Sequence, residues 1–127
     1  VEEFMRLYTP YRGFARTPLK DVEVGGCPIK AGEPVALTYA SANRDEAVFP
    51  EPDVFKLDRP NISEHLAFGR GPHYCAGAHL GRLELRVALE ELLASTQALE
   101  VCGEVVYCPY PEIGPYQVPL RFVSAAI

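Results

Sequence analysis

The chain lacks three features that would assign it to common functional classes. No apolar run approaches the about 20 residues that a helix needs to cross a bilayer. The net charge is -5 and the arginines are scattered, so the basic surface of a nucleic-acid-binding protein is missing. The four cysteines show no CxxC spacing and follow no signal peptide. We therefore expect a cytoplasmic protein without a membrane span, without nucleic acid as a partner and without a secreted disulfide framework.

The length and composition favour one globular domain. The chain has 127 residues, of which 48% are hydrophobic and 23% are charged, an ordinary balance for a folded domain. It starts at Val1, and the segment VEEFMRLY is helix-forming from its first residue without a residue that would cap the helix. This start predicts that residues 1–127 are part of a larger domain.

The local patterns predict an α+β fold with little regular structure in its middle. Apolar and polar residues alternate in DVEVGGCPI around Gly25 and Gly26, which predicts two strands joined by a tight turn. A further strand is expected over Pro34–Ala40. Residues 41–64 are proline-interrupted, show no sustained period and predict a long coil. Alternation over residues 98–123 predicts a terminal strand hairpin.

One cysteine stands where a glycine-rich loop meets a helix. The loop is FGRGPHYCAG, residues 68–77, and apolar residues then recur at helical spacing over about 76–94. At this junction the unpaired N–H groups of the first helical turn favour an anionic Cys75 sulfur. The loop glycines allow positive φ and a close approach of the backbone to a flat ligand. The alternative is a buried free cysteine beside a loop.

This loop resembles the cysteine loop of the cytochrome P450 haem-thiolate monooxygenases. Six residues fit the signature F-G-x-G-x-H-x-C-x-G, namely Phe68, Gly69, Gly71, His73, Cys75 and Gly77. The resemblance implies haem b as the cofactor and Cys75 as the axial iron ligand. It also implies that Phe68 packs near the sulfur, that N–H groups around Ala76 and Gly77 tune it, and that His73 binds a haem propionate.

A second similarity to this family lies near the amino end. Glu3-Phe4-Met5-Arg6 resembles the ExxR motif, whose two charges lie one helical turn apart. The alternative is an ordinary surface pair. In the family a third basic residue, from the coil before the cysteine loop, completes a buried charge network. Val54 stands where many members have arginine, which leaves Arg59 as the candidate here.

The same resemblance suggests residues for propionate and substrate contacts. Arg16 falls where a propionate-binding arginine is expected, and its alternative is a solvent-facing strand residue. Two segments correspond to borders of the substrate cavity, with ordinary loop packing as the alternative. Their residues are Tyr11, Gly13, Phe14, Ile113 and Tyr116.

The resemblance implies a monooxygenase that inserts one oxygen atom of O2 into a small organic molecule. Its electron donor would be a ferredoxin served by an NAD(P)H-dependent reductase. Only the carboxyl-terminal, proximal-face part of the family's fold is represented, since nothing resembles its oxygen-side helix. A non-catalytic remnant or haem-binding module is therefore the alternative, and the isolated chain is expected to be inactive. A metal site of Cys75, Cys102 and Cys108 is a third reading, but this spacing fits no common site.

Overall fold

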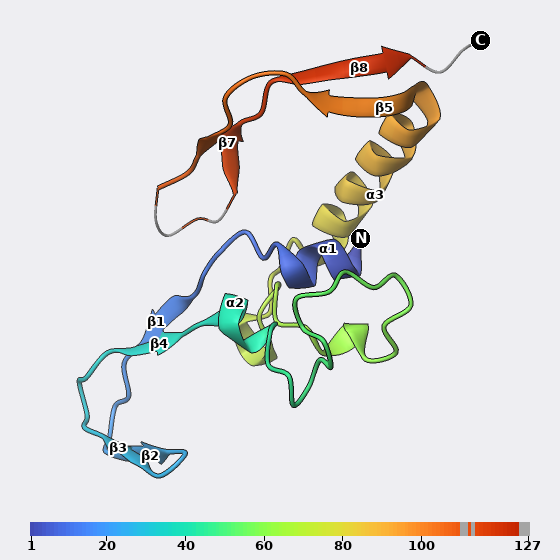
Figure 1. The fold of residues 1–127 in the computed structure, drawn as a ribbon. Helices are drawn as coiled ribbons and strands as arrows, with labels where there is room; N and C mark the ends of the chain where they lie inside the picture. The colour runs from blue at the N-terminus through green and yellow to red at the C-terminus, as the bar shows by residue number, and fades with distance from the viewer. Residues whose placement is uncertain (110–111, 113, 125–127) are drawn as a thin grey trace.

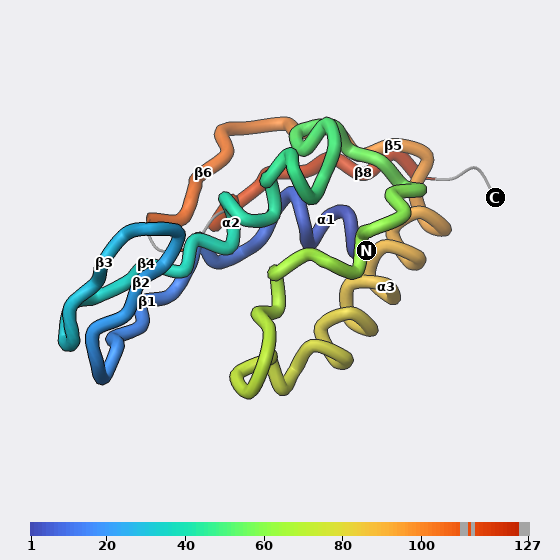
Figure 2. The backbone as a smooth tube through the Cα atoms, turned by 90° about the horizontal axis from the view of Figure 1, so that it is seen from below, coloured from blue at the N-terminus to red at the C-terminus, as the bar shows by residue number. Residues whose placement is uncertain are grey.

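A short helix, α1 (Glu2–Leu7), lies at the centre of the molecule. The computed structural model describes residues 1–109, 112 and 114–124. Within them α1 lies between the beginning of the long helix α3 (Ala78–Ser95) and the coil that follows the first strands (Figures 1 and 2). No helix in these described residues has the length and apolar character required to span a membrane.

Two short antiparallel strand pairs follow α1. They are β1 (Phe14–Arg16) with β4 (Val35–Leu37), and β2 (Val22–Val24) with β3 (Cys27–Ile29). The turn between β2 and β3 has φ of 58° at Gly25 and 80° at Gly26, which confirms the predicted glycine turn. The strand expected over Pro34–Ala40 is shorter than predicted. It ends at Leu37 because the backbone turns into the helix α2 (Tyr39–Ala42).

The segment from α2 to α3 is mainly coil, and it packs around α1. Its regular parts are two single turns of 3-10 helix, η1 (Ile62–Glu64) and η2 (Gly71–His73). The helix after the cysteine loop spans Ala78–Ser95, with Gly77 at its N-cap, whereas the sequence predicts about 76–94.

The described residues of the terminal region form four strands instead of one simple hairpin. The outer pair is β5 (Thr96–Val101) with β8 (Leu120–Ser124), and the inner pair is β6 (Val106–Tyr107) with β7 (Pro115–Gln117). Both pairs are antiparallel, and each contains an irregularity in its register. Figure 1 shows the outer pair at the far end of α3, away from β2 and β3.

The buried core is small and unusually polar. Among the described residues the buried hydrophobic side chains are Met5, Leu7, Phe49 and Ala78. The buried polar ones are more numerous: Glu3, Arg6, Thr9, Asn43, Arg59 and His65. Phe49 lies between two of the charges, with its ring centroid 5.2 Å from the Arg6 guanidinium and 5.9 Å from that of Arg59. Hydrogen-bonded charge therefore holds the centre of this chain together.

Most of α3 does not join that core. Leu80, Leu83 and Val87, which recur at helical spacing, are 59%, 56% and 47% exposed. The first two turns of α3 contact the region around α1, through the completely buried Ala78 and through Arg82, which pairs with Glu2. The helix thus projects from the core and presents its leucines to the outside.

Candidate functional site

Cys75 lies at the end of the glycine-rich loop, in the turn between η2 and α3. Its N–H donates to the Phe68 carbonyl at 2.9 Å, and its carbonyl accepts the Ala78 N–H at 3.1 Å. These two bonds tie the loop closed and attach it to the first turn of α3. The Cys75 side chain is exposed. The sulfur is therefore presented at a surface, in contrast to the alternative of a cysteine buried in the core.

Glycine is required at particular points of this loop. Gly69 and Gly71 adopt φ of 70° and 76°, a conformation that residues with a Cβ rarely adopt. A Cβ at Gly77 would lie 3.9 Å from the Cys75 sulfur. Among the hydrogen bonds of the described residues, none is donated by the N–H of Ala76 or Gly77. The sulfur thus lies beside backbone donors that remain available to stabilise negative charge.

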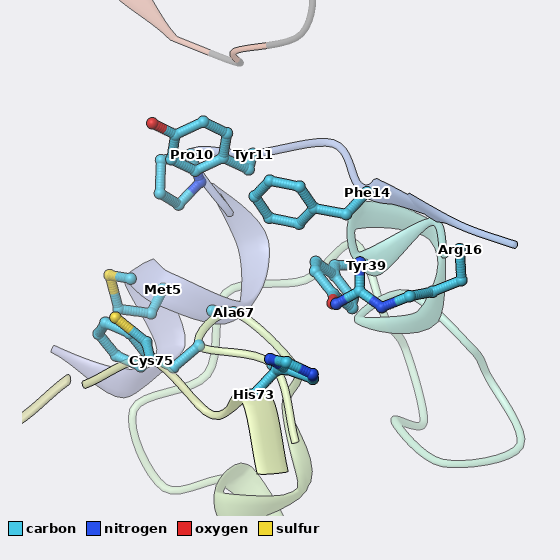
Figure 3. A pocket seen from close by; sticks show the side chains of 11 residues that line it. Met5, Pro10, Tyr11, Phe14, Arg16, Tyr39, Ala67, His73 and Cys75 are labelled. Atoms are coloured by element: carbon cyan, nitrogen blue, oxygen red, sulfur yellow. The ribbon is translucent and has the colours of Figure 1, made fainter. Parts of the chain in front are cut away.

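A cavity of about 380 Å³ opens beside the cysteine (Figure 3). Its walls come from α1 and the segment after it, from β1 and α2, and from the cysteine loop. The lining is mainly apolar and aromatic, and consists of Met5, Pro10, Tyr11, Phe14, Arg16, Tyr39, Ala67, Phe68, Gly69, His73 and Cys75. Figure 3 shows Cys75 next to Met5 on one side of the cavity and Arg16 on the other, with His73 between them.

Two basic side chains in this wall lack carboxylate partners among the described residues. The Arg16 guanidinium donates to the carbonyl of Ala15 at 2.9 Å and forms no ion pair there. His73 likewise has no side-chain hydrogen bond within the part of the chain that the structure describes. A thiol, an apolar slot and two free basic groups are thus combined in one cavity.

Only some of the remaining residues predicted for the cavity line it in the structure. Tyr11 and Phe14 line the cavity with their rings stacked 5.6 Å apart. Gly13 does not line it, but a Cβ there would lie 2.1 Å from the Leu37 carbonyl oxygen, so glycine permits the close pairing of β1 and β4. Tyr116 is 78% exposed and is not among the lining residues. Ile113 lies outside the described residues.

Glu3 and Arg6 form the centre of a buried charge cluster. The Glu3 carboxylate accepts bonds from Arg6 Nε and Nη2, both at 2.8 Å, and from Arg59 Nε at 3.2 and 3.3 Å. The other Arg6 and Arg59 donors reach backbone carbonyls of the coil, including that of Val54. The hydrogen bond from Arg6 is the main cause that lowers the pKa of the Glu3 carboxyl from 4.5 to about 2.

This cluster connects α1 to the coil at a separation of more than fifty residues. Glu3, Arg6 and Arg59 are 4%, 0% and 5% exposed. The geometry excludes an ordinary surface pair and brings Arg59 to Glu3, whereas the Val54 side chain is 47% exposed. None of the three residues of this cluster lines the cavity. The cluster can therefore influence the site only by holding together the segments of chain that form the cavity.

Sequence reasoning missed a second cluster, centred on Glu2 and Arg82. Arg82 Nε and Nη2 donate to the Glu2 carboxylate at 2.9 to 3.1 Å, and His65 Nε2 lies 2.9 Å from the same carboxylate. Burial opposes ionisation of Glu2, but the bonds from Arg82 and His65 outweigh it and lower the pKa of the carboxyl. Arg82 lies 80 positions and His65 lies 63 positions from Glu2 in the sequence, so no local spacing could have revealed these pairs.

Asn43 is a further buried connection that the sequence did not reveal. Its side chain donates to Thr9 Oγ1 at 2.7 Å and accepts the N–H of Leu66 at 2.6 Å. Its backbone carbonyl accepts a bond from Arg6 at 2.7 Å. This one residue therefore links α1 and α2 to the segment immediately before the cysteine loop.

Comparison with known proteins assigns the chain to a family. The cytochrome P450 family model matches residues 1–103. The chain therefore belongs to the cytochrome P450 family, a family whose members bind haem.

Similar proteins agree with this assignment over nearly the whole chain. Cytochrome P450-terp of a Pseudomonas species is 44% identical over 98% of this chain and 29% of its own length. Steroid C26-monooxygenase of Mycolicibacterium smegmatis is 37% identical over 99% of this chain and 32% of its own. The solved structure of cytochrome P450 CYP109Q5 from Chondromyces apiculatus superposes with a TM-score of 0.90 at 42% identity, covering 99% of this chain and 33% of that one.

These comparisons confirm the predicted fold class. The chain is an α+β part of the cytochrome P450 fold and spans about a third of the length of the relatives that it matches.

Proposed function

We propose that this chain forms the cysteine side of a haem-thiolate monooxygenase, with Cys75 as the iron ligand. One observation carries the proposal: an exposed cysteine at a helix start shares an apolar cavity with two basic side chains that have no carboxylate partner among the described residues. The family assignment supports it, as does the name monooxygenase carried by a relative.

The residues of the cavity fit haem b, judged by their chemistry. Haem is a flat, largely apolar ligand with two carboxylates at one edge and an iron that thiolate binds well. Phe14, Phe68 and Tyr39 provide apolar walls, and Gly69 keeps the backbone free of a side chain. Arg16 and His73 offer donors for the two carboxylates, since guanidinium and imidazole both bind anionic oxygen.

The residues of this chain would hold the cofactor and set its surroundings. Haem bound at Cys75 would supply the chemistry that activates O2 and inserts one of its oxygen atoms into an organic substrate. The free N–H groups of Ala76 and Gly77 would stabilise negative charge on the sulfur. Tyr11 and Phe14 would contribute to the wall that a small organic substrate contacts.

The proposed electron donor is a ferredoxin served by an NAD(P)H-dependent reductase, and the proposed location is the cytoplasm. All four cysteines are free in the structure, which suits a reducing compartment. Purified natural protein containing these residues should oxidise its substrate only when ferredoxin, reductase, NAD(P)H and O2 are all present.

Replacing the cysteine tests the iron assignment. In the full-length natural chain that carries these residues, the reduced carbonyl complex should show the strongly red-shifted Soret band of a thiolate ligand. Cys75→Ser should remove this band, because a hydroxyl is a much weaker donor than a thiolate. Cys102→Ser is the matched control, since Cys102 is also exposed but does not line the cavity. An unchanged band in Cys75→Ser would show that another residue ligates the iron.

A further inference from the structure

Arg82 makes contacts that the proposed function does not use. It lies in the second turn of α3, outside the residues that line the cavity. Its guanidinium carbon lies 4.5 Å from the centroid of the Phe68 ring. Phe68 itself lines the cavity with Cys75, and its carbonyl accepts the Cys75 N–H. Arg82 therefore contacts the side chain of the loop's first residue, whose backbone carbonyl bonds to the cysteine.

The Phe68 ring is confined from two directions. A Cβ at Gly81 would lie 3.7 Å from Phe68 Cε1, so the ring packs directly on the backbone of α3. The Arg82 guanidinium covers it at a distance typical of a cation–π contact. The ring thus lies between the first turns of the helix and the cavity.

The guanidinium is itself fixed on all three of its nitrogens. Nε and Nη2 bind the Glu2 carboxylate, and Nη1 donates to the Tyr74 hydroxyl at 2.8 Å. Tyr74 directly precedes the cysteine, and Glu2 belongs to α1. The side chains of Arg82 and Glu2 are only 28% and 32% exposed, so solvent screens their charges incompletely. A guanidinium held in this way has little freedom to leave the ring.

We propose that Arg82 is a positioning residue for the Cys75 loop, holding Phe68 and Tyr74 in place through a guanidinium that Glu2 anchors to α1. The inference rests on the proposed function, because it takes Cys75 as the iron ligand. Arg82 and Glu2 also place opposite charges near the loop. Each charge influences the reduction potential of an iron bound there, since nearby charge is one determinant of that potential.

The two charges predict shifts of opposite sign in the full-length holoprotein. Arg82→Met leaves the Glu2 carboxylate with less compensation, so the iron midpoint potential should fall. Glu2→Gln leaves the guanidinium uncompensated, so the potential should rise. Combining the two changes should bring the potential back toward that of the natural protein. A purely structural role would produce no such reversal of sign.

Loss of positioning should also be visible in haem binding. Arg82→Met should release haem about 10-fold faster, a typical cost of losing a residue that supports a metal ligand. It should also lower the thiolate-ligated share of the reduced carbonyl complex. Tyr74→Phe, which removes one hydrogen bond, should produce a smaller loss in the same direction. Arg86→Met is the matched control, because this exposed arginine of α3 forms no ion pair with the described residues.

The outcomes separate this inference from the proposed function. If the natural protein shows no thiolate band, Cys75 is not the ligand, and both proposals are wrong. If the band is present but Arg82→Met and Glu2→Gln shift the potential in one direction or not at all, only the role of Arg82 is overturned. If Arg82→Met does not fold, unchanged potential, spectrum and haem release in Glu2→Gln and Tyr74→Phe overturn it equally.

Discussion

At the residue scale, a single carboxylate compensates two buried guanidinium groups. Glu3 accepts bonds from both Arg6 and Arg59, and the excess positive charge is shared among backbone carbonyls of the coil. Removing one member of such a cluster leaves buried charge without its partner, which costs far more than breaking a surface pair.

Glu3→Gln should therefore destabilise the full-length protein by about 3–5 kcal/mol, as expected for a broken buried pair. Denaturant unfolding monitored by circular dichroism measures the change. Glu100→Gln is the control, since Glu100 pairs with Arg121 at an exposed position and should contribute about 0–1 kcal/mol. Equal effects of the two substitutions would contradict a structural role for the buried cluster.

The stabilising effect of Glu3 should depend on pH in a defined direction. Its folded pKa of about 2 lies below the ordinary value of 4.5. A depressed pKa contributes stability that is complete above the ordinary value and is lost as the pH falls toward the folded value. Glu3→Gln should accordingly reduce the dependence of the free energy of unfolding on pH between pH 4.5 and about 2.

The two basic residues of the cavity make a separate prediction. Replacing Arg16 by Leu and His73 by Ala in the holoprotein should accelerate haem release at least about 10-fold, since each charge-assisted hydrogen bond contributes about 1.5–3 kcal/mol. The thiolate spectrum of the protein that retains haem should remain, because the sulfur ligand is untouched. His79→Ala, an exposed change on α3, is the control. Unchanged haem release in the double variant would reject the propionate role.

At the element scale, α3 contacts the region around α1 through its first turns, which include a glycine. Gly81 lies inside the helix, where glycine is about 1 kcal/mol less favourable than alanine. An added Cβ would meet the Phe68 ring at 3.7 and 3.8 Å, which is ordinary van der Waals contact. The helix therefore has room for a methyl group at the point where it supports the cysteine loop.

Gly81→Ala should stabilise the full-length protein by about 0.5–1 kcal/mol without altering its thiolate spectrum. Thermal or denaturant unfolding provides the measurement. Ala88→Gly, at an exposed position of the same helix, should have a similar effect in the opposite direction. Destabilisation by Gly81→Ala would show that Phe68 cannot accommodate the methyl group and that its placement is tighter than the contact distances indicate.

At the scale of the whole molecule, residues 1–127 bury few apolar side chains. The described buried hydrophobic residues number four, whereas Leu80, Leu83 and Leu93 of α3 and Phe122 of β8 are all more than half exposed. Exposed apolar surface of this extent favours association. Relatives of this chain are about three times as long, since it spans 29% to 33% of them.

Residues 1–127 expressed alone should therefore associate in size-exclusion chromatography and should bind a hydrophobic dye. Given haem, ferredoxin, reductase and NAD(P)H, they should form no product in proportion to the electrons consumed, because they correspond to only about a third of the length of the cytochrome P450 relatives. The full-length natural protein is the control. A monomeric segment with coupled, regioselective turnover would contradict this expectation.

Short-range features of the site were predictable from the sequence. The residues of the cysteine loop are contiguous in the sequence. Two of its glycines, Gly69 and Gly71, occupy positions where the backbone requires a positive φ. The Gly25–Gly26 turn and the pairing of Glu3 with Arg6 are equally local, since one depends on backbone conformation and the other on helical spacing. Such features depend on neighbours within a few residues, so the order of amino acids alone determines them.

Tertiary structure alone decided which distant groups meet. It brought Arg82 to Glu2 across 80 positions and left the leucines of α3 outside the core, whereas the resemblance had already suggested Arg59 as a partner of Glu3. It also placed Met5 of α1 and Tyr39 of α2 in the same cavity as Cys75. No periodicity encodes these encounters, because they depend on how the coil folds around α1. The cysteine loop could therefore be predicted from the sequence, while the pairing of Arg82 with Glu2 beside it could be found only in the folded chain.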